Sequence, residues 1–116
     1  MAAPNIVSPT TITLKGISST VGTSSMTVLA CPSNKAIKVS ALVAANITAT
    51  ATAVVVDISD GTNSRSIVSN IAVPANASLL CITRDNPVYL EEGKSLKITA
   101  GATGAIHFTG SYEEIA

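Results

Sequence analysis

Residues 37–43 read Ile-Lys-Val-Ser-Ala-Leu-Val, a stretch in which apolar side chains recur at every second position. This period of two is typical of a β-strand with one buried face, because successive side chains point to opposite sides of a strand. We therefore expect Ile37, Val39, Ala41 and Val43 to face the core. The fold class follows from how often this alternation recurs.

The alternation continues along the chain, and turn signals such as Asp60-Gly61 separate the segments. The rows expected to share one face include Ile67, Ser69, Ile71 and Val73, then Leu96, Ile98 and Ala100, and finally Ile106, Phe108 and Tyr112. The run Leu79 to Thr83 is almost continuously apolar and predicts a strand buried on both faces. Gly16 and the Ser/Thr/Gly-rich residues 18–25 are predicted to interrupt the first strand or to form a bulge in it. The expected strands fall near residues 11–15, 26–31, 37–43, 54–58, 67–73, 79–83, 88–90, 96–100 and 106–112.

Helical periodicity is hard to find. Residues 41–53 are rich in alanine, which favours helix, but threonine alternates with alanine over 48–53, and β-branched residues at that spacing resist helix. We interpret this segment as strand or extended loop. The sequence thus predicts an all-β fold, an antiparallel two-sheet β-sandwich of about eight strands, either jelly-roll or immunoglobulin-like.

The composition sets further limits. The chain has 116 residues, which fits one domain, and its seven basic side chains balance seven acidic ones. Zero net charge argues against a nucleic-acid partner, and the longest apolar runs are far too short to span a membrane. The first residues lack the charged and apolar regions of a secretory signal. We expect no nucleic acid and no membrane among its partners.

The two cysteines, Cys31 and Cys81, both stand among apolar neighbours. They could form one disulfide, but we favour two buried thiols, because nothing in the sequence indicates export to an oxidising compartment. No CxxC or Cys/His spacing is present, so the sequence predicts no zinc site.

The sequence offers no catalytic residues. His107 is the one histidine, and the alternation places it on the outward side of the strand that holds Ile106 and Phe108. It lacks a motif that would supply a nucleophile and an orienting group. The pairs Glu91-Glu92 and Glu113-Glu114 are adjacent, so in a strand their side chains would point to opposite faces, which does not suit paired-carboxylate catalysis. We predict that the protein is not an enzyme and uses no cofactor.

Two looser patterns are also interpreted as structural. Asp57, Asp60 and Asn63 resemble a calcium loop but miss its spacing, so a polar hairpin tip is favoured and no metal site is predicted. Asn46-Ile47-Thr48 and Asn76-Ala77-Ser78 match the glycosylation sequon by chance in a Ser/Thr-rich chain.

Residues 1–9 are predicted to form an extended N-terminal arm, and residues 10–116 a single β-sandwich domain. Pro4 and Pro9 disfavour pairing within a sheet of the same domain, whereas Ile6 and Val7 are apolar and poorly placed in water. An arm that lies on a neighbouring subunit resolves this conflict, with these four residues as the subunit contact.

The surface composition also favours assembly. Ser and Thr number 14 each, and only 14 residues carry a charge, so the outward faces of the strands must expose Thr, Ser and Ala. Such side chains can be sealed against a neighbour without desolvating charges. A free monomer usually carries more charge.

Met1 to Val7, Thr10-Thr11-Ile12-Thr13, the segment Asn86 to Leu96 and the end Ser111-Tyr112-Glu113-Glu114-Ile115 together resemble a family of small virion structural proteins. That family belongs to tailed phages of marine and freshwater cyanobacteria and related bacteria. The resemblance implies a location in the virion, after assembly in the host cytoplasm. It also implies contacts with the major capsid protein or other virion proteins.

Three roles are compatible with this resemblance. The first is a capsid decoration (cement) protein that binds the outer shell and stabilises it as a homo-oligomer, with a trimer favoured. The second is a tail, neck or baseplate subunit. The third is a host-adhesion module, which ranks last because sugar-binding sites usually need aromatic platforms and this chain has three aromatic residues.

Overall fold

The computed structural model describes residues 11–83 and 85–116. Within these residues every regular element is a strand. The nine strands overlap the nine expected segments, against a predicted count of about eight. The predicted arm, with Pro4, Ile6, Val7 and Pro9, lies outside the described residues. The strands are β1 (Ile12–Val21), β2 (Met26–Ala30), β3 (Ala36–Asn46), β4 (Thr52–Ser59), β5 (Ser64–Val73), β6 (Ser78–Ile82), β7 (Val88–Leu90), β8 (Ser95–Ala100) and β9 (Ile106–Ile115).

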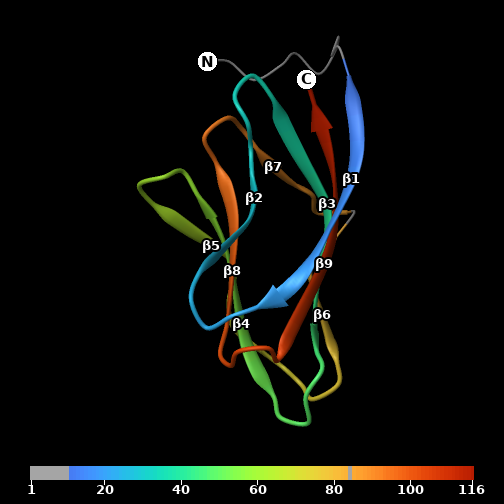
Figure 1. The fold of residues 1–116 in the computed structure, drawn as a ribbon, viewed down its shortest axis with the longest axis vertical. Helices are drawn as coiled ribbons and strands as arrows, with labels where there is room; N and C mark the ends of the chain where they lie inside the picture. Colours follow the sequence, from blue (N-terminus) through green and yellow to red (C-terminus); the bar gives the residue numbers. More distant parts are fainter. Residues whose placement is uncertain (1–10, 84) are drawn as a thin grey trace.

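The strands form two antiparallel sheets that face each other (Figure 1). One sheet has the order β1-β9-β3-β6, with β7 also pairing with β3, and the other has the order β2-β8-β4-β5. The two-sheet β-sandwich is therefore confirmed. The chain changes sheet at most connections, and the β4–β5 hairpin at Asp60-Gly61 is an exception.

This strand order decides between the two predicted topologies. In an immunoglobulin sandwich the first two strands share a sheet. Here β1 and β2 lie in different sheets, and β1 pairs with the last strand, β9. The fold is a jelly roll, with β7 as a short addition to the edge beside β6.

The core lies between the sheets and is built from the inward rows of both. On β8 and β9 the predicted rows are confirmed, because Leu96, Ile98 and Ala100 are buried, as are Ile106 and Phe108, and Tyr112 packs partly buried against the core. Each fully buried aliphatic side chain of this kind stabilises the fold by about 1.5–3 kcal/mol. The central buried residues are Ile37, Val39, Leu42, Ala44, Val54, Val56, Leu96, Ile98, Ile106 and Phe108.

In β3 the predicted row holds only for its first half. It continues through Val39 and then reverses, because Leu42 and Ala44 are buried whereas Ala41 and Val43 are partly exposed. The register with β9 shifts between Val39 and Ala41, which marks a β-bulge. One extra residue moves every later side chain to the opposite face, so the prediction for Ala41 and Val43 was wrong.

Two other strand predictions were also wrong. No interruption occurs at Gly16, because β1 runs unbroken to Val21 and pairs with β9 at every residue. A complete neighbouring strand supplies the pairing that a Ser/Thr-rich sequence does not favour by itself. The run from Leu79 is not buried on both faces, because β6 lies at a sheet edge and the Leu80 side chain is 65% exposed.

The alternation predicted for residues 67–73 also breaks. Val68 and Val73 are buried, whereas Ile71 is exposed. Asn70 has a φ of 54°, a left-handed conformation that asparagine tolerates better than most residues. It stands where the pairing with β4 is irregular, so it shifts which side chains of β5 face inward.

Candidate interaction surface

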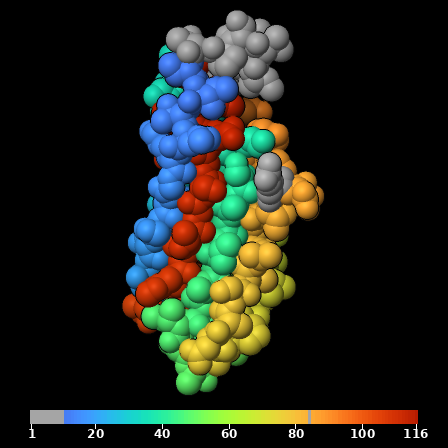
Figure 2. Space-filling view, turned by 90° about the vertical axis from the view of Figure 1, so that its right-hand side faces the viewer, coloured from blue at the N-terminus to red at the C-terminus, as the bar shows by residue number. Residues whose placement is uncertain are grey.

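The outward side of the five-stranded sheet is a broad surface with few charges. Figure 2 shows β1, β9, β3 and β6 side by side across it. The register places its side chains in rows, for example Leu14, Glu113, Lys38 and Tyr89. We call this surface the outer face. It consists of Ile12, Leu14, Gly16, Ser18, Thr20, Lys38, Ala41, Val43, Ala45, Ser78, Leu80, Tyr89, His107, Thr109, Ser111 and Glu113.

The outer face combines small polar side chains with exposed apolar ones. Leu14 is 75% exposed and Tyr89 is 61% exposed, at opposite ends of one row. Between them lie Lys38 and Glu113, opposite each other on neighbouring strands. They are the only residues of the outer face that carry a formal charge, and the two charges balance. A partner could therefore cover this surface with little cost of charge desolvation.

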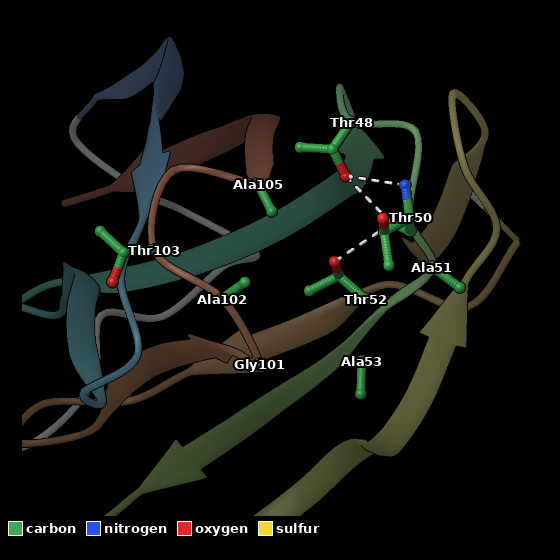
Figure 3. Close-up of a pocket in the computed structure, with 9 residues that line it drawn as sticks. All are labelled: Thr48, Thr50, Ala51, Thr52, Ala53, Gly101, Ala102, Thr103 and Ala105. Carbon is green, nitrogen blue, oxygen red and sulfur yellow. Dashed lines mark hydrogen bonds between the residues drawn. The ribbon is translucent and has the colours of Figure 1, made fainter.

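A hollow of about 390 Å³ lies at the end of the sandwich where β3 turns into β4 and β8 turns into β9. Figure 3 shows hydroxyl and methyl groups around it, and no residue that lines it carries a charge. It can therefore hold a neutral or apolar group but offers no acid, base or nucleophile of the kind catalysis needs. Its lining residues are Thr48, Thr50, Ala51, Thr52, Ala53, Gly101, Ala102, Thr103 and Ala105.

The wall of this hollow is held by the buried amide of Asn46, at the end of β3. Its Nδ2 donates to the carbonyl oxygens of Thr50 (2.8 Å) and Val73 (3.0 Å). Its Oδ1 accepts hydrogen bonds from the backbone N–H of Thr48 (2.9 Å) and from the Thr48 hydroxyl (2.7 Å). From the sequence, Asn46 was interpreted only as part of a chance sequon. The available signal was an Asx turn, in which Asn bonds the backbone two residues on.

His107 lies on the outer face, as predicted from the alternation of β9, and its side chain is exposed. Its cross-strand neighbours are Thr20 and Ala45. The shallow hollow beside it, about 240 Å³ in volume, is lined by serine, threonine and phenylalanine side chains besides His107. No carboxylate lines this hollow to orient the imidazole as a general base requires.

In each of the two acidic pairs, Glu113-Glu114 and Glu91-Glu92, one carboxylate forms a structural contact. Glu113 faces outward, whereas Glu114 accepts hydrogen bonds from the Nζ atoms of Lys35 (3.0 Å) and Lys15 (3.4 Å). The hydrogen bond from Lys35, followed by that from Lys15, lowers the pKa of the Glu114 carboxyl. In the other pair, Glu92 accepts a hydrogen bond from the backbone N–H of Asn34 (2.7 Å). These contacts tie strand ends and loops together.

The three residues that resemble a calcium loop do not converge. Asp60 accepts hydrogen bonds from the backbone N–H groups of Asn63 (2.7 Å) and Thr62 (2.9 Å), and these bonds lower the pKa of its carboxyl. Asp57 instead accepts a hydrogen bond from the Ser66 hydroxyl (2.8 Å). Asp60 therefore closes a hairpin tip. Residues 11–83 and 85–116 contain no group of three or more His, Cys, Asp or Glu side chains that could hold a metal ion.

Both cysteines are free thiols. Cys31 is buried and lies 3.1 Å from the carbonyl oxygen of Lys35. Burial, and then the nearby carboxylates of Glu114 and Glu92, raise the pKa of the Cys31 thiol. Cys81 is only partly buried, less than predicted, and desolvation raises its pKa to about 11. Neither thiol is poised for disulfide exchange, which requires the thiolate.

Alkylation tests this assignment of the thiols. Under denaturing, non-reducing conditions the chain should take up two labels, because no disulfide has to be reduced first. In the native protein at pH 8 both thiols should react much more slowly than in the denatured chain, since the raised pKa values leave little thiolate. Mass spectrometry counts the labels, and a denatured chain that accepts none would instead contain a disulfide.

No family model matches the sequence, and no curated protein matches it significantly. The part of the chain that the structure describes holds no helix long and apolar enough to cross a membrane. Several solved structures are similar in fold. One is a subunit of Bacillus endospore appendages, which form disulfide-linked pili. It is 16% identical, with a TM-score of 0.56, over 90% of this chain and 85% of that chain.

Two viral structures align less well. A pentameric capsid protein isolated from metagenomic phage sequences is 18% identical with a TM-score of 0.45, over 84% of this chain and 59% of that chain. The subunit of infectious bursal virus-derived T=1 particles is 15% identical with a TM-score of 0.49, over 93% of this chain and 32% of that chain. This chain thus spans about three fifths of the first and a third of the second. It shares its fold with the appendage subunit, at an identity too low to indicate a shared function.

Proposed function

We propose that the protein is a non-enzymatic structural component of a phage virion, and that it decorates the capsid as a cement protein. The observation that carries this proposal is the outer face. It is wide, it exposes Leu14, Leu80 and Tyr89, and its Lys38 and Glu113 charges balance. A surface of this kind suits permanent coverage in an assembly. The resemblance of the sequence to small virion proteins supports the same role.

The size of the outer face fits this role. Four strands spaced about 4.8 Å apart and nine residues long cover roughly 600 Å² in projection, close to the ~800 Å² that one partner contributes to a standard interface. A single copy would bind with modest affinity. We propose that the protein acts as a homo-oligomer, with trimers at local three-fold positions of the shell, so that several weak contacts act together.

A tail, neck or baseplate subunit is the alternative role, because such a subunit would also bury a face with few charges against other virion proteins. Host adhesion is less well supported, since the hollow beside β4 is lined by threonine, alanine and glycine and carries no aromatic platform. Disulfide linkage of subunits, as in the endospore appendages, is not favoured by thiols whose pKa values are raised.

Shell binding tests the outer face directly. Thr109→Glu places a carboxylate near the middle of it, and we expect at least a tenfold loss of binding to undecorated capsids, because the charge must be desolvated without a partner. Thr99→Glu is the matched control, because Thr99 faces away from the core on the other sheet and should leave binding unchanged. Co-sedimentation with capsids measures both variants.

The salt dependence of the same assay adds a second criterion. Balanced charges offer no net electrostatic attraction, so the wild-type protein should bind almost equally well at low and high salt. Equal binding by both variants, or release of the wild-type protein by moderate salt, would contradict a role for the outer face.

We also propose that residues 1–9 form an arm that contacts a neighbouring subunit through Pro4, Ile6, Val7 and Pro9. Deleting residues 2–8 should leave a folded β-sandwich, because the core is built from later strands, while assembly on the shell weakens. Far-UV circular dichroism measures the fold and co-sedimentation measures assembly. Loss of folding on deletion would show that the segment is part of the β-sandwich of the same chain and not an arm.

A further inference from the structure

The free edge of β1 differs from every other sheet edge in the described part of the chain. Sheet edges commonly carry short strands, bulges or charges that prevent pairing with another chain. Here the edge strands β2 and β6 are each five residues long, and the pairing of each with its neighbour contains a register shift. Strand β7 is only three residues long. The long edge strand β5 is irregular at Asn70. Only β1 is ten residues long and pairs without any shift.

Hydrogen bonding shows which groups of β1 face this edge. Thr11 and Ala116 exchange two backbone hydrogen bonds, of 3.1 and 2.9 Å. In an antiparallel pair such hydrogen-bonded positions alternate along the strand. The N–H and C=O groups directed away from β9 therefore belong to the even-numbered residues, from Ile12 to Thr20.

Gly16 lies in the middle of these residues and is not required by the fold of its own chain. Its backbone forms no bulge, and a Cβ added there would meet only the carbonyl oxygen of Gly110, at an ordinary 3.7 Å. Glycine weakens a strand interior, and it often marks a place where another backbone approaches closely. Lys15 is the single charged residue of β1, and its Nζ turns to Glu114, 3.4 Å away.

We propose that β1 pairs antiparallel with β1 of a second copy, about a two-fold axis at Gly16. Leu14 then lies opposite Ser18 of the other copy, and Ile12 opposite Thr20, so that one pair is β-branched on both sides and no like charges meet across the axis. The two outer faces join into one continuous surface. A register centred on Lys15 would instead set two like charges opposite each other, which disfavours it.

This two-fold contact differs from the three-fold contact of the proposed trimer, and a closed shell contains axes of both kinds. The pairing is a property of the isolated chain. The absence of a dimer would therefore leave the proposed role on the virion standing, and the absence of capsid binding would leave the dimer standing.

Cysteine cross-linking tests the register. In the proposed dimer, two Gly16→Cys residues form a hydrogen-bonded pair with Cα atoms about 5.5 Å apart, within disulfide range. Two Ser18→Cys residues are separated by four positions, about 13 Å along the strands, and cannot be bridged. After mild oxidation, Gly16→Cys should give covalent dimers, and Ser18→Cys no more than the wild-type protein with its own Cys31 and Cys81. Equal cross-linking of both variants, or of neither, would overturn the proposal.

Sedimentation velocity provides an independent readout. The wild-type protein should show a reversible dimer, and Ser18→Pro should reduce it to a monomer, because proline removes an N–H from the free edge and leaves the bonds to β9 intact. Ser18→Ala retains this N–H and should still dimerise. A wild-type protein that stays monomeric at all concentrations, or a Ser18→Pro variant that is folded and dimeric, would contradict the pairing. If Ser18→Pro fails to fold, the cysteine pair decides the question alone.

Discussion

Replacing Gly110 by alanine should destabilise the protein by about 3 kcal/mol, the upper range for overpacking a core position. Gly110 lies in β9 between Ile17 of β1 and Leu42 of β3. A Cβ at this position would come within 2.8 Å of the carbonyl oxygen of Ala41 and 3.3 Å of the Ile17 side chain. The obstruction is backbone beside the β3 bulge, which cannot move without disturbing the pairing of β3 and β9.

Gly16→Ala is the matched control, because its new Cβ lies only in ordinary contact range of Gly110. We expect a change below about 0.5 kcal/mol for this exposed position. Urea unfolding followed by circular dichroism, at low protein concentration, measures the free energy of unfolding of both variants. If Gly110→Ala proves as stable as Gly16→Ala, the close packing of β9 against the bulge is wrong.

Replacing Asn46 by aspartate should have the second large effect, about 3 kcal/mol or more at pH 7. The Asn46 side chain is 2% exposed, and its Nδ2 donates to the carbonyl oxygens of Thr50 and Val73. A carboxylate would turn a negative oxygen toward these two carbonyls and lose both donated hydrogen bonds. The loop that forms the threonine-lined hollow would lose its attachment to the end of β5.

The pH dependence of Asn46→Asp identifies the cause. Burial beside carbonyl oxygens raises the folded-state pKa of the new carboxyl above its unfolded value of about 3.9. The destabilisation is therefore smallest below pH 4, where the carboxyl is protonated in both states, and grows as the pH rises through the folded-state pKa. Asn76→Asp, at an exposed turn, is the control and should cost less than about 1 kcal/mol. A stability loss independent of pH would point to packing instead of charge.

The sequence predicted what depends on simple alternation. The inward rows of β8 and β9, the hairpin at Asp60-Gly61 and the outward position of His107 are all confirmed. Both strands keep the period of two where these rows lie, and β9 departs from it only at its end, where Ile115 is buried. The fold class was therefore accessible from the sequence alone.

Two of the failed predictions, those for β3 and β5, have the same physical cause, an irregular backbone. The bulge of β3 before Ala41 and the left-handed Asn70 of β5 each shift the side chains that follow, and neither has a distinct sequence signal. The exposure of Leu80 reflects the position of β6 at a sheet edge, which depends on strand order. Strand order is set by packing between distant segments, and local patterns do not encode it.

The candidate surface was predicted only in kind. The shortage of charge indicated that outward strand faces would expose Ser, Thr and Ala, and seven of the sixteen residues of the outer face are of these types, beside exposed apolar side chains such as Leu14 and Leu80. Which sheet carries it depends on register, as does the balanced position of Lys38 opposite Glu113. The free edge of β1 was likewise hidden, because its Ser/Thr-rich sequence was expected to end the strand early.

Electron microscopy of labelled particles tests the central claim, that the protein is a structural component of the capsid exterior. Purified virions would be labelled with gold-conjugated antibody against the protein, and the particle would be reconstructed to count copies. The proposed role predicts density over the whole shell in hundreds of copies. A ring of a few to a dozen copies at the tail or neck, label confined to fibre tips, or no label on the particle at all would contradict it.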